Sequence, residues 1–393
     1  MISMTRLKKR GWRGFVALLA AFVCAGTWAA GHMRSLRDRT EVATITEKMR
    51  TICVGRYLVD APEDANVNLS SEMIAGFTID TVEKTEPAFH ARMAAREAEI
   101  SARGAEGNGD GEGGLVAARD LSVPGAVGRS FIYGRSRGYL MAGDRRIAME
   151  SVSVVAHAHI DGATFTLAAK GTEEASAREA KSLLARLGVR GEDDIPLTPG
   201  FCVRRGVFVE PLPDHTNEHI VFHLGLPGHP DVGLALSSIA GGKADEGLLA
   251  RVAATDADSS ADELLRVTKL RTGKRSVNGI DGEEVLERVR ELNFTTGYGF
   301  MWEAAGVPDD LLHPSLLLRM ETGTNPRPGG KPVESSLHQN AVMALWDRMS
   351  SSIRLRKPDA RPVVSTSSER WPAINGQRAS PHRPSRDAPI GHS

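Results

Sequence analysis

The chain has 393 residues, of which 41% are hydrophobic and 25% are charged, and its 49 Lys plus Arg balance 49 Asp plus Glu. This composition is typical of a globular protein of about two domains and excludes a wholly disordered chain. Neutrality argues against a general nucleic-acid binder, and three cysteines exclude a disulfide-dense scaffold or a multi-cysteine zinc module.

Residues 1–30 have the pattern of an export signal. They contain five basic residues and no acidic one, then an apolar stretch over 15–25, then small residues ahead of Gly31. The apolar stretch is shorter than the ~20 residues of a comfortable transmembrane helix. We therefore expect a periplasmic protein with a cleaved signal peptide; an uncleaved signal anchor in the inner membrane is the alternative. Without residues 1–30 the chain holds 44 basic and 49 acidic residues, a net charge of −5.

Periodicity predicts a run of elements between the signal and residue 192. An amphipathic pattern marks a helix at 173–187, and helix-favouring residues predict another at 88–102. The strands are expected at 52–59, 76–82, 131–133, 138–142, 146–159 and 164–169.

The next part of the chain predicts a similar set of elements. Helices are expected at 245–253 and at 335–353. The second has apolar residues at helical spacing: Val342, Leu345, Trp346 and Met349. The strands are expected at 203–210, 219–223, 232–239, 265–270, 283–292, 298–303 and 316–321. Short strands in runs with helices between the runs predict an α+β fold with mainly antiparallel sheets.

Two openings of the form Cys-Val-x-Arg, at Cys53 and at Cys202, lie 149 residues apart and lead into an apolar run, an acid and a proline. Together with the similar closing helices, they predict two tandem similar domains, 51–192 and 200–357, joined by a Pro-rich link. The 358–393 tail is rich in Pro, Ser and Arg without an apolar period, which predicts disorder.

Gly134-Arg135-Ser136-Arg137-Gly138 matches G-x-S-x-G, the nucleophile elbow of α/β hydrolases. That chemistry requires a strand, a sharp turn and then a helix, with backbone amides forming an oxyanion hole. Here a second strand follows the motif, and no HGGG-type oxyanion segment precedes it. We expect the glycines to shape a hairpin and assign no catalytic residue.

A His-x-His-x-Asp string places His157, His159 and Asp161 on one face of a strand, where they could offer three ligands to a metal. Asp161-Gly162 is also an ordinary hairpin turn signal. We favour the polar face of a half-exposed strand over a metal site.

Two further groups of residues have weak functional patterns. The Gly-rich acidic loop 104–114 lacks the Gly-Lys-Ser/Thr ending of a phosphate cradle, and we expect a mobile surface loop, with Ca²⁺ binding as the alternative. His215, His219, His223 and His229 lack metal-ligand spacing and are expected at the surface. We therefore expect no metal and no cofactor.

Cys53 and Cys202 are the only cysteines after the signal, and they occupy matching positions in the repeat. In an oxidising compartment a single disulfide pinning the two halves together is the favoured interpretation. Two buried thiols in equivalent cores are the alternative.

The opening Thr51-Ile52-Cys53-Val54-Gly55-Arg56-Tyr57-Leu58-Val59-Asp60-Ala61-Pro62 resembles the immunity proteins of type VI secretion phospholipase effectors. So do the second opening, Pro199 to Val203, and the closing Ala344-Leu345-Trp346-Asp347 with Ile353 to Arg356. The resemblance covers about residues 50–357. It implies a periplasmic, non-enzymatic, two-domain α+β protein that binds a lipase effector between its domains and sterically blocks its active site. It transfers no catalytic motif and no contact residues.

Two other functions remain open on the sequence alone. One is an exported hydrolase using Ser136, and the other is a periplasmic metal or scaffold module using His157. The sequence does not identify the partner lipase, the partner-binding residues or the oligomeric state.

Overall fold

The computed structural model describes residues 38–106, 113–212, 217–241 and 246–357. The predicted signal at 1–30, the predicted tail at 358–393 and residues 107–112 of the Gly-rich loop lie outside these ranges. In the described part of the chain no helix is long and apolar enough to cross a membrane.

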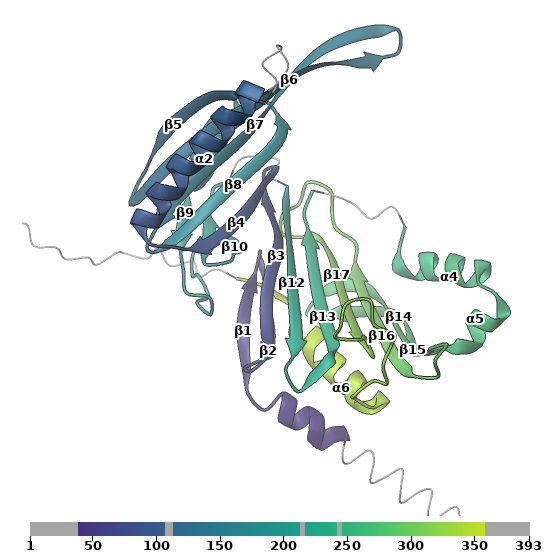
Figure 1. The fold of residues 1–393 in the computed structure, drawn as a ribbon. Coiled ribbons are helices and arrows are strands. Elements are labelled where there is room, and N and C mark those ends of the chain that lie inside the picture. The colour runs from purple at the N-terminus through teal and green to yellow at the C-terminus, as the bar shows by residue number, and fades with distance from the viewer. Residues whose placement is uncertain (1–37, 107–112, 213–216, 242–245, 358–393) are drawn as a thin grey trace, which may run out of the picture. The chain divides into compact units, whose positions relative to one another are not determined.

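The first half begins with a helical stretch at 38–45 and then alternates hairpins and helices (Figure 1). Its helices are α2 (Glu86–Glu106) and α3 (Ser176–Leu184). Its strands are β1 (Met49–Val54), β2 (Tyr57–Pro62), β3 (Asn66–Ile74), β4 (Phe77–Glu83), β5 (Leu115–Val123), β6 (Ala126–Ala142), β7 (Arg145–Ile160), β8 (Ala163–Thr172) and β9 (Leu187–Val189).

The second half repeats this succession of elements, except that two helices stand where the first half has α2. Its helices are α4 (Leu248–Asp258), α5 (Ala261–Arg266) and α6 (Gln339–Ser350). Its strands are β10 (Gly200–Val203), β11 (Gly206–Val209), β12 (Glu218–Leu226), β13 (His229–Ile239), β14 (Val267–Val277), β15 (Ile280–Arg290), β16 (Thr296–Ala304), β17 (Ser315–Thr322) and β18 (Arg354–Leu355).

One twelve-stranded sheet takes six strands from each half, in the order β14-β15-β16-β17-β13-β12-β3-β4-β8-β7-β6-β5. Strands β3 and β12 form its centre and pair antiparallel, so the sheet passes from one half to the other without a break in hydrogen bonding. Reading outwards from this centre, both halves give the same order of equivalent strands. The α+β prediction with mainly antiparallel sheet is confirmed.

The final short strand of each half pairs with the opening hairpin of the other half. Strand β9 closes the first half and pairs with β11, while β18 closes the second half and pairs with β2. Because each half thus completes a small sheet of the other, the two repeats fold as one interlocked unit.

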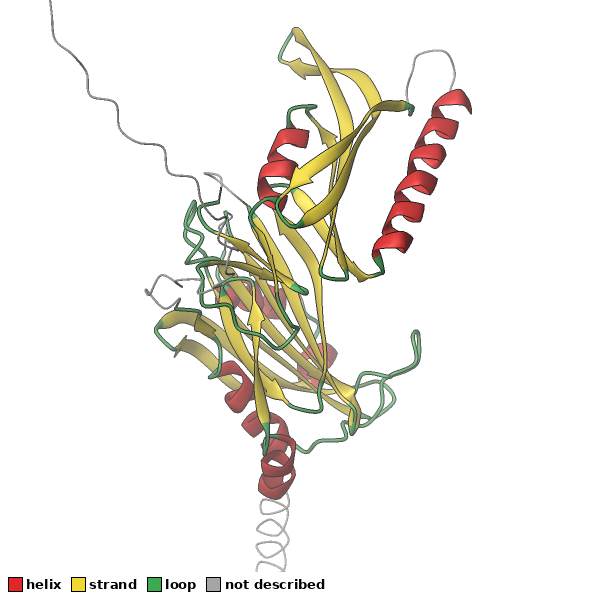
Figure 2. Ribbon diagram, turned by 90° about the vertical axis from the view of Figure 1, so that its left-hand side faces the viewer, coloured by secondary structure: helices red, strands yellow, loops and turns green. Residues whose placement is uncertain are grey.

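Helices cover both faces of the first half of the sheet (Figure 2). Helix α3 buries Ala180, Leu183 and Leu184 in the main core, which continues through both halves. Helix α2 carries Pro87 in its first turn, where the missing N–H costs no helical hydrogen bond. It packs Phe89 onto the opposite face, in a second cluster with Phe131.

The second half buries large aromatic side chains on α6 and on strand β16. Trp346 packs edge-on against Phe300 at a ring-centroid distance of 5.8 Å, and its indole N–H donates to Glu284 at 2.7 Å. Trp302 is fully buried and donates to the carbonyl of Arg275 at 3.0 Å. The predicted apolar face of this helix is therefore correct.

Two predicted strands are wrong because each is a tight hairpin. The single strand expected over 52–59 turns at Gly55-Arg56, and the one expected over 203–210 turns at Arg204-Arg205. Gly55 and Arg205 have φ values of 57° and 61°. Apolar residues continue on both sides of each turn, so the hydrophobic pattern does not mark where the chain reverses.

Other differences come from elements with weak patterns. Strands β3 and β5 were not predicted, and the strands expected at 131–133 and 138–142 form one continuous strand, β6. The strand expected from residue 265 begins only after α5, whose N-terminus has a capping box between Ser260 and Glu263.

Candidate functional site

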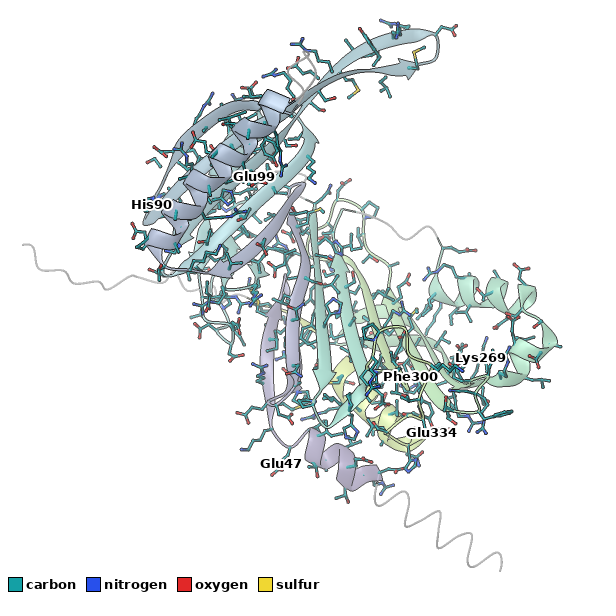
Figure 3. The ribbon with its side chains drawn as sticks, viewed as in Figure 1. Glu47, His90, Glu99, Lys269, Phe300 and Glu334 are labelled. Atoms are coloured by element: carbon teal, nitrogen blue, oxygen red, sulfur yellow. A yellow bond between two sulfur atoms is a disulfide. The ribbon has the colours of Figure 1, made fainter. Side chains whose placement is uncertain are left out.

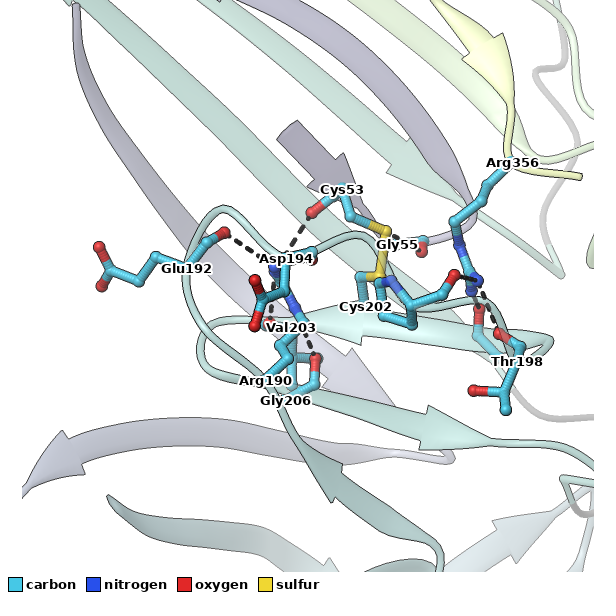
Figure 4. Close-up of a disulfide and its surroundings, with 12 residues drawn as sticks. Cys53, Gly55, Arg190, Glu192, Asp194, Thr198, Cys202, Val203, Gly206 and Arg356 are labelled. Atoms are coloured by element: carbon cyan, nitrogen blue, oxygen red, sulfur yellow. Dashed lines mark hydrogen bonds between the residues drawn. A yellow bond between two sulfur atoms is a disulfide. The ribbon is translucent and has the colours of Figure 1, made fainter. Parts of the chain in front are cut away.

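The junction between the halves is built on the two opening hairpins (Figure 4). The structure joins Cys53 to Cys202 through a disulfide with an S–S distance of 2.09 Å and a Cα–Cα distance of 6.0 Å. Beside it, Gly55 and Cys202 exchange two backbone hydrogen bonds of 3.1 and 2.8 Å. Both cysteines are buried, so the link lies inside the folded unit.

A buried ion pair crosses the same junction. Arg56, in the first hairpin turn, donates to both carboxylate oxygens of Glu218 at 2.7 and 2.8 Å, and it also contacts Glu210. Arg56 and Glu218 are 6% and 3% exposed. Burial raises the pKa of Glu218, and the Arg56 guanidinium offsets only part of that shift. Removing either partner would leave a charge in a dry site.

Two equivalent arginines tie down the loops beside the hairpins. Arg190 directly follows β9 and Arg356 directly follows β18, and burial lowers the pKa of both guanidiniums. Arg190 donates to the carbonyls of Gly206, Gly191, Glu192, Asp194, Cys53 and Val203. Arg356 donates to the carbonyls of Pro196, Thr198 and Gly200 at 2.9, 2.6 and 2.5 Å. Each arginine therefore fixes the neighbouring backbone by donating hydrogen bonds to its carbonyl oxygens.

Glu72 is a buried carboxylate at this junction. It accepts a hydrogen bond from the backbone N–H of Arg204 at 3.1 Å. Burial raises the pKa of Glu72 to about 7. Since the neighbouring charges of Arg204 and Arg190 lower that pKa only in part, this group titrates near neutrality in the folded protein.

Ser136 lies within a β-ribbon and not on a nucleophile elbow. It is part of β6 and pairs with Ser151 of β7, so a strand and no helix follows the G-x-S-x-G motif. The hairpin expected at these glycines is wrong: residues 134–138 lie inside the continuous strand β6, and Gly134 has a φ of 65° at the place where the β6–β7 register shifts.

The two histidines of the His-x-His-x-Asp string lie beneath helix α2, and the expected half-exposed polar face is wrong. His157 and His159 are both below 10% exposed and bond Thr166 and Thr164 at 2.9 and 3.0 Å. His159 stacks on Phe89 at 5.5 Å. Asp161 and Gly162 form the turn after the strand. Burial lowers the pKa of His157 to about 4, so the ring is a neutral core residue at physiological pH.

The remaining histidines lie apart from one another. His215 is outside the described residues, His219 is half-buried on β12, and His223 is exposed and bonds Ser70. Within the described ranges no group of three His, Cys, Asp or Glu side chains is placed to hold a metal ion.

The outer part of the β6–β7 hairpin is a two-stranded ribbon, residues 136–151, that leaves the sheet. Strand β5 pairs with β6 only as far as Tyr133, and β8 pairs with β7 only as far as Val152. Beyond those points β6 and β7 pair only with each other, up to a two-residue turn at Gly143-Asp144. Figure 1 shows this ribbon extending past the rest of the sheet.

Large apolar side chains are concentrated on this ribbon. The described residues contain fifteen exposed large hydrophobic side chains, and a third of them lie within 139–149. These five are 46–65% exposed: Tyr139, Leu140, Met141, Ile147 and Met149. An apolar cluster of this density on a soluble protein marks an interaction surface. The sequence predicted the strands but not this surface. The signal that could have indicated it is that apolar residues occur on both faces of the strands within 139–149, whereas only one face of a strand can pack on a core.

The cavities offer a weaker candidate. One of about 530 Å³ lies beside the start of α4 and is lined mainly by polar and charged residues, including Arg275, Glu283 and Glu303. Glu283 accepts the backbone N–H of Leu249 at 2.9 Å and Glu303 pairs with Arg251, so these carboxylates already have partners. The ribbon is the better candidate for recognition.

Family models match nearly all of the described chain. The model described as the N-terminal domain of Tle cognate immunity protein 4 matches residues 50–193, and the C-terminal domain model of the same family matches residues 194–358. No curated protein matches the chain in sequence.

Solved structures share the fold at low identity. The apo immunity protein TplEi of the type VI secretion system (T6SS) from Pseudomonas aeruginosa is 22% identical, with a TM-score of 0.63 over 78% of this chain and 97% of that one. The structure of the same protein with the "L" peptide is 22% identical, with a TM-score of 0.59 over 78% of this chain and 98% of that one. A chain of the Tle4-Tli4 complex is 21% identical, with a TM-score of 0.64 over 78% of this chain and 97% of that one.

Proposed function

The chain belongs to the Tle cognate immunity protein 4 family, and we propose that it binds and neutralises a phospholipase effector of a type VI secretion system. It is an effector-binding immunity protein whose partner is a protein. The proposal adds the effector's chemical class, the compartment and the way in which inhibition works.

The match of both family domains over residues 50–358 is the observation that carries this proposal. The structure supports it because the two halves share a sheet, exchange their final strands and are joined by a buried ion pair. A rigid inhibitor loses little conformational entropy on binding, which favours tight association.

Inhibition is steric in this proposal. The effector is held between surfaces of the two domains of this chain, which covers the entrance to the effector's active site. The chain performs no chemistry on the effector or its lipid. The position of Ser136 in a ribbon supports a non-enzymatic role.

Binding takes place in the periplasm in this proposal, where the effector meets its lipid substrate. The basic and apolar pattern of residues 1–30 and the Cys53–Cys202 pair both fit an oxidising, exported environment. Mass spectrometry of the protein from a periplasmic extract gives the mature N-terminus and tests whether the signal is cleaved.

Co-purification of residues 31–393 with the phospholipase effector encoded in the same genome tests the function. We expect a stable complex and loss of lipase activity at equimolar ratio. Full lipase activity without a complex would remove this pair from consideration. A cell expressing the effector in its periplasm should survive only when the full chain, including residues 1–30, is expressed with it.

A further inference from the structure

The ribbon of residues 136–151 is built to stand away from the sheet. Both of its long edges are unpaired, and register shifts occur in β6 between Tyr133 and Ser136 and in β7 between Val152 and Val154. Such bulges twist and redirect a strand, and they are frequent where a sheet presents residues to a partner.

The two faces of the ribbon carry different side chains. Strand pairing sets Leu140 opposite Ile147 and Met149 opposite Gly138, so these apolar residues share one face. We call this the apolar face, defined by Leu140, Ile147 and Met149. Figure 3 shows side chains projecting from both faces of the ribbon without another element covering them.

The opposite face is mixed. It carries Tyr139, with the Arg146 guanidinium over its ring at 4.5 Å, and Met141, which pairs with Arg146 across the strands. Closer to the sheet, Arg137 pairs with Glu150 at 3.2 Å. Both faces therefore contain exposed apolar groups.

Charge separates the ribbon from the rest of the chain. The ribbon, residues 136–151, contains three arginines against Asp144 and Glu150, a net charge of +1. Residues 31–393 as a whole have a net charge of −5. A basic, apolar ribbon on an acidic protein is complementary to an apolar surface with an acidic rim.

We propose that this ribbon is the arm by which the chain docks on its effector, with the apolar face in an apolar recess of the effector and Arg145 and Arg146 against carboxylates at its rim. The proposal rests on the immunity function above and adds the surface and the partner chemistry to it. An isolated two-stranded ribbon is only marginally stable in water, so a partner that covers it also orders it.

Two other occupants fit the observations less well. A membrane surface favours an element with one apolar and one basic face, whereas this ribbon exposes apolar residues on both. A second copy would bring two ribbons of charge +1 together, with Arg145 and Arg146 next to each turn.

The main test replaces the apolar face and keeps the strands, because threonine favours extended backbone. The variant Leu140→Thr/Ile147→Thr/Met149→Thr should weaken binding to the purified effector by at least about tenfold in calorimetry, as expected for a buried apolar anchor. Leu264→Gln/Leu265→Gln, which changes exposed leucines on α5, should bind like the wild type. Both variants should unfold at the wild-type temperature.

A charge variant tests the rim. Arg145→Glu/Arg146→Glu should slow association and remove part of its salt dependence, because rim charges act mainly on the encounter rate. Arg348→Glu, an exposed arginine on α6, is the matched control and should leave the rate unchanged.

The outcomes separate the two proposals. If the wild type does not bind the effector, the function proposed above is wrong for that pair. If the wild type binds and the threonine variant binds equally well, the ribbon is not the docking arm. If the threonine variant keeps its effector affinity but loses a binding to phosphatidylethanolamine–phosphatidylglycerol vesicles that the wild type shows, that result would assign the ribbon to a membrane. If it instead loses a dimer that light scattering detects for the wild type, the ribbon serves self-association.

Discussion

In the first half, α2 runs for 21 residues along β5 and β6 and buries Phe89, Met93 and Ile100, whereas in the second half α4 has 11 residues and buries only Leu248. The strands beneath follow the same order in both halves. Cavities of about 530 and 200 Å³ remain beside Leu248. The repeat therefore fixes the path of the chain but leaves the helix that covers this face free to vary.

The connection between equivalent strands also differs. Strands β15 and β16 are joined by residues 291–295, while β6 and β7 continue far past the sheet before they turn. The half with the tightly packed helix thus also carries the projecting ribbon. A well-anchored sheet can support an element that has no packing of its own.

Phe89→Ala should have the largest effect on stability. We expect a loss of about 3–5 kcal/mol in the free energy of unfolding, because a buried aromatic ring is removed from a closed cluster. Leu248→Ala should cost about 2 kcal/mol or less, since that side chain already borders cavities. Urea unfolding of both variants measures the difference, and equal losses would contradict the contrast between the two helices.

Glu218→Gln tests whether the halves unfold together. The substitution leaves buried Arg56 with only the partly exposed Glu210 as a counter-ion. It should cost about 3 kcal/mol and should shift one common transition rather than split it. The control is Glu321→Gln. Glu321 pairs with Arg319, and both side chains are about half exposed. That substitution should cost less than about 1 kcal/mol. Two separate transitions in the Glu218 variant would mean that the halves are independent.

Cys53→Ser/Cys202→Ser should lower the free energy of unfolding by about 2–4 kcal/mol, because the disulfide closes a loop across 149 residues of sequence separation. Reduction of the wild type by dithiothreitol should reproduce the shift. A double variant as stable as the oxidised protein would show that the shared sheet alone holds the halves together.

Glu72 predicts a pH dependence at the junction. Its folded pKa of about 7 lies above the ordinary 4.5, so the folded state holds the proton more tightly than the unfolded state does. Its contribution to stability should therefore fall as pH rises from about 4.5 through 7, by about 1–3 kcal/mol. Glu72→Gln should flatten this part of the stability profile, whereas Glu63→Gln, at an exposed site, should not.

Ser136→Ala should have the smallest effect of all. The hydroxyl lies on a ribbon strand, so neither effector binding nor stability should change. A hydrolytic activity of the purified protein that disappears in this variant would support an exported hydrolase instead.

The sequence alone identified much of the secondary structure. The apolar spacing of Val342, Leu345, Trp346 and Met349 correctly predicted the buried face of α6, and the repeated Cys-Val openings indicated the tandem organisation. These features depend on local periodicity, which residues a few positions apart determine by themselves.

The tertiary structure decided what the local pattern left open. His157 and His159 look like a polar strand face until α2, which begins at Glu86, covers them. The apolar residues of 139–149 look like core until the strands on either side stop short of them. Burial depends on which distant segments lie alongside, so the core histidines and the exposed ribbon became distinguishable only in the folded chain.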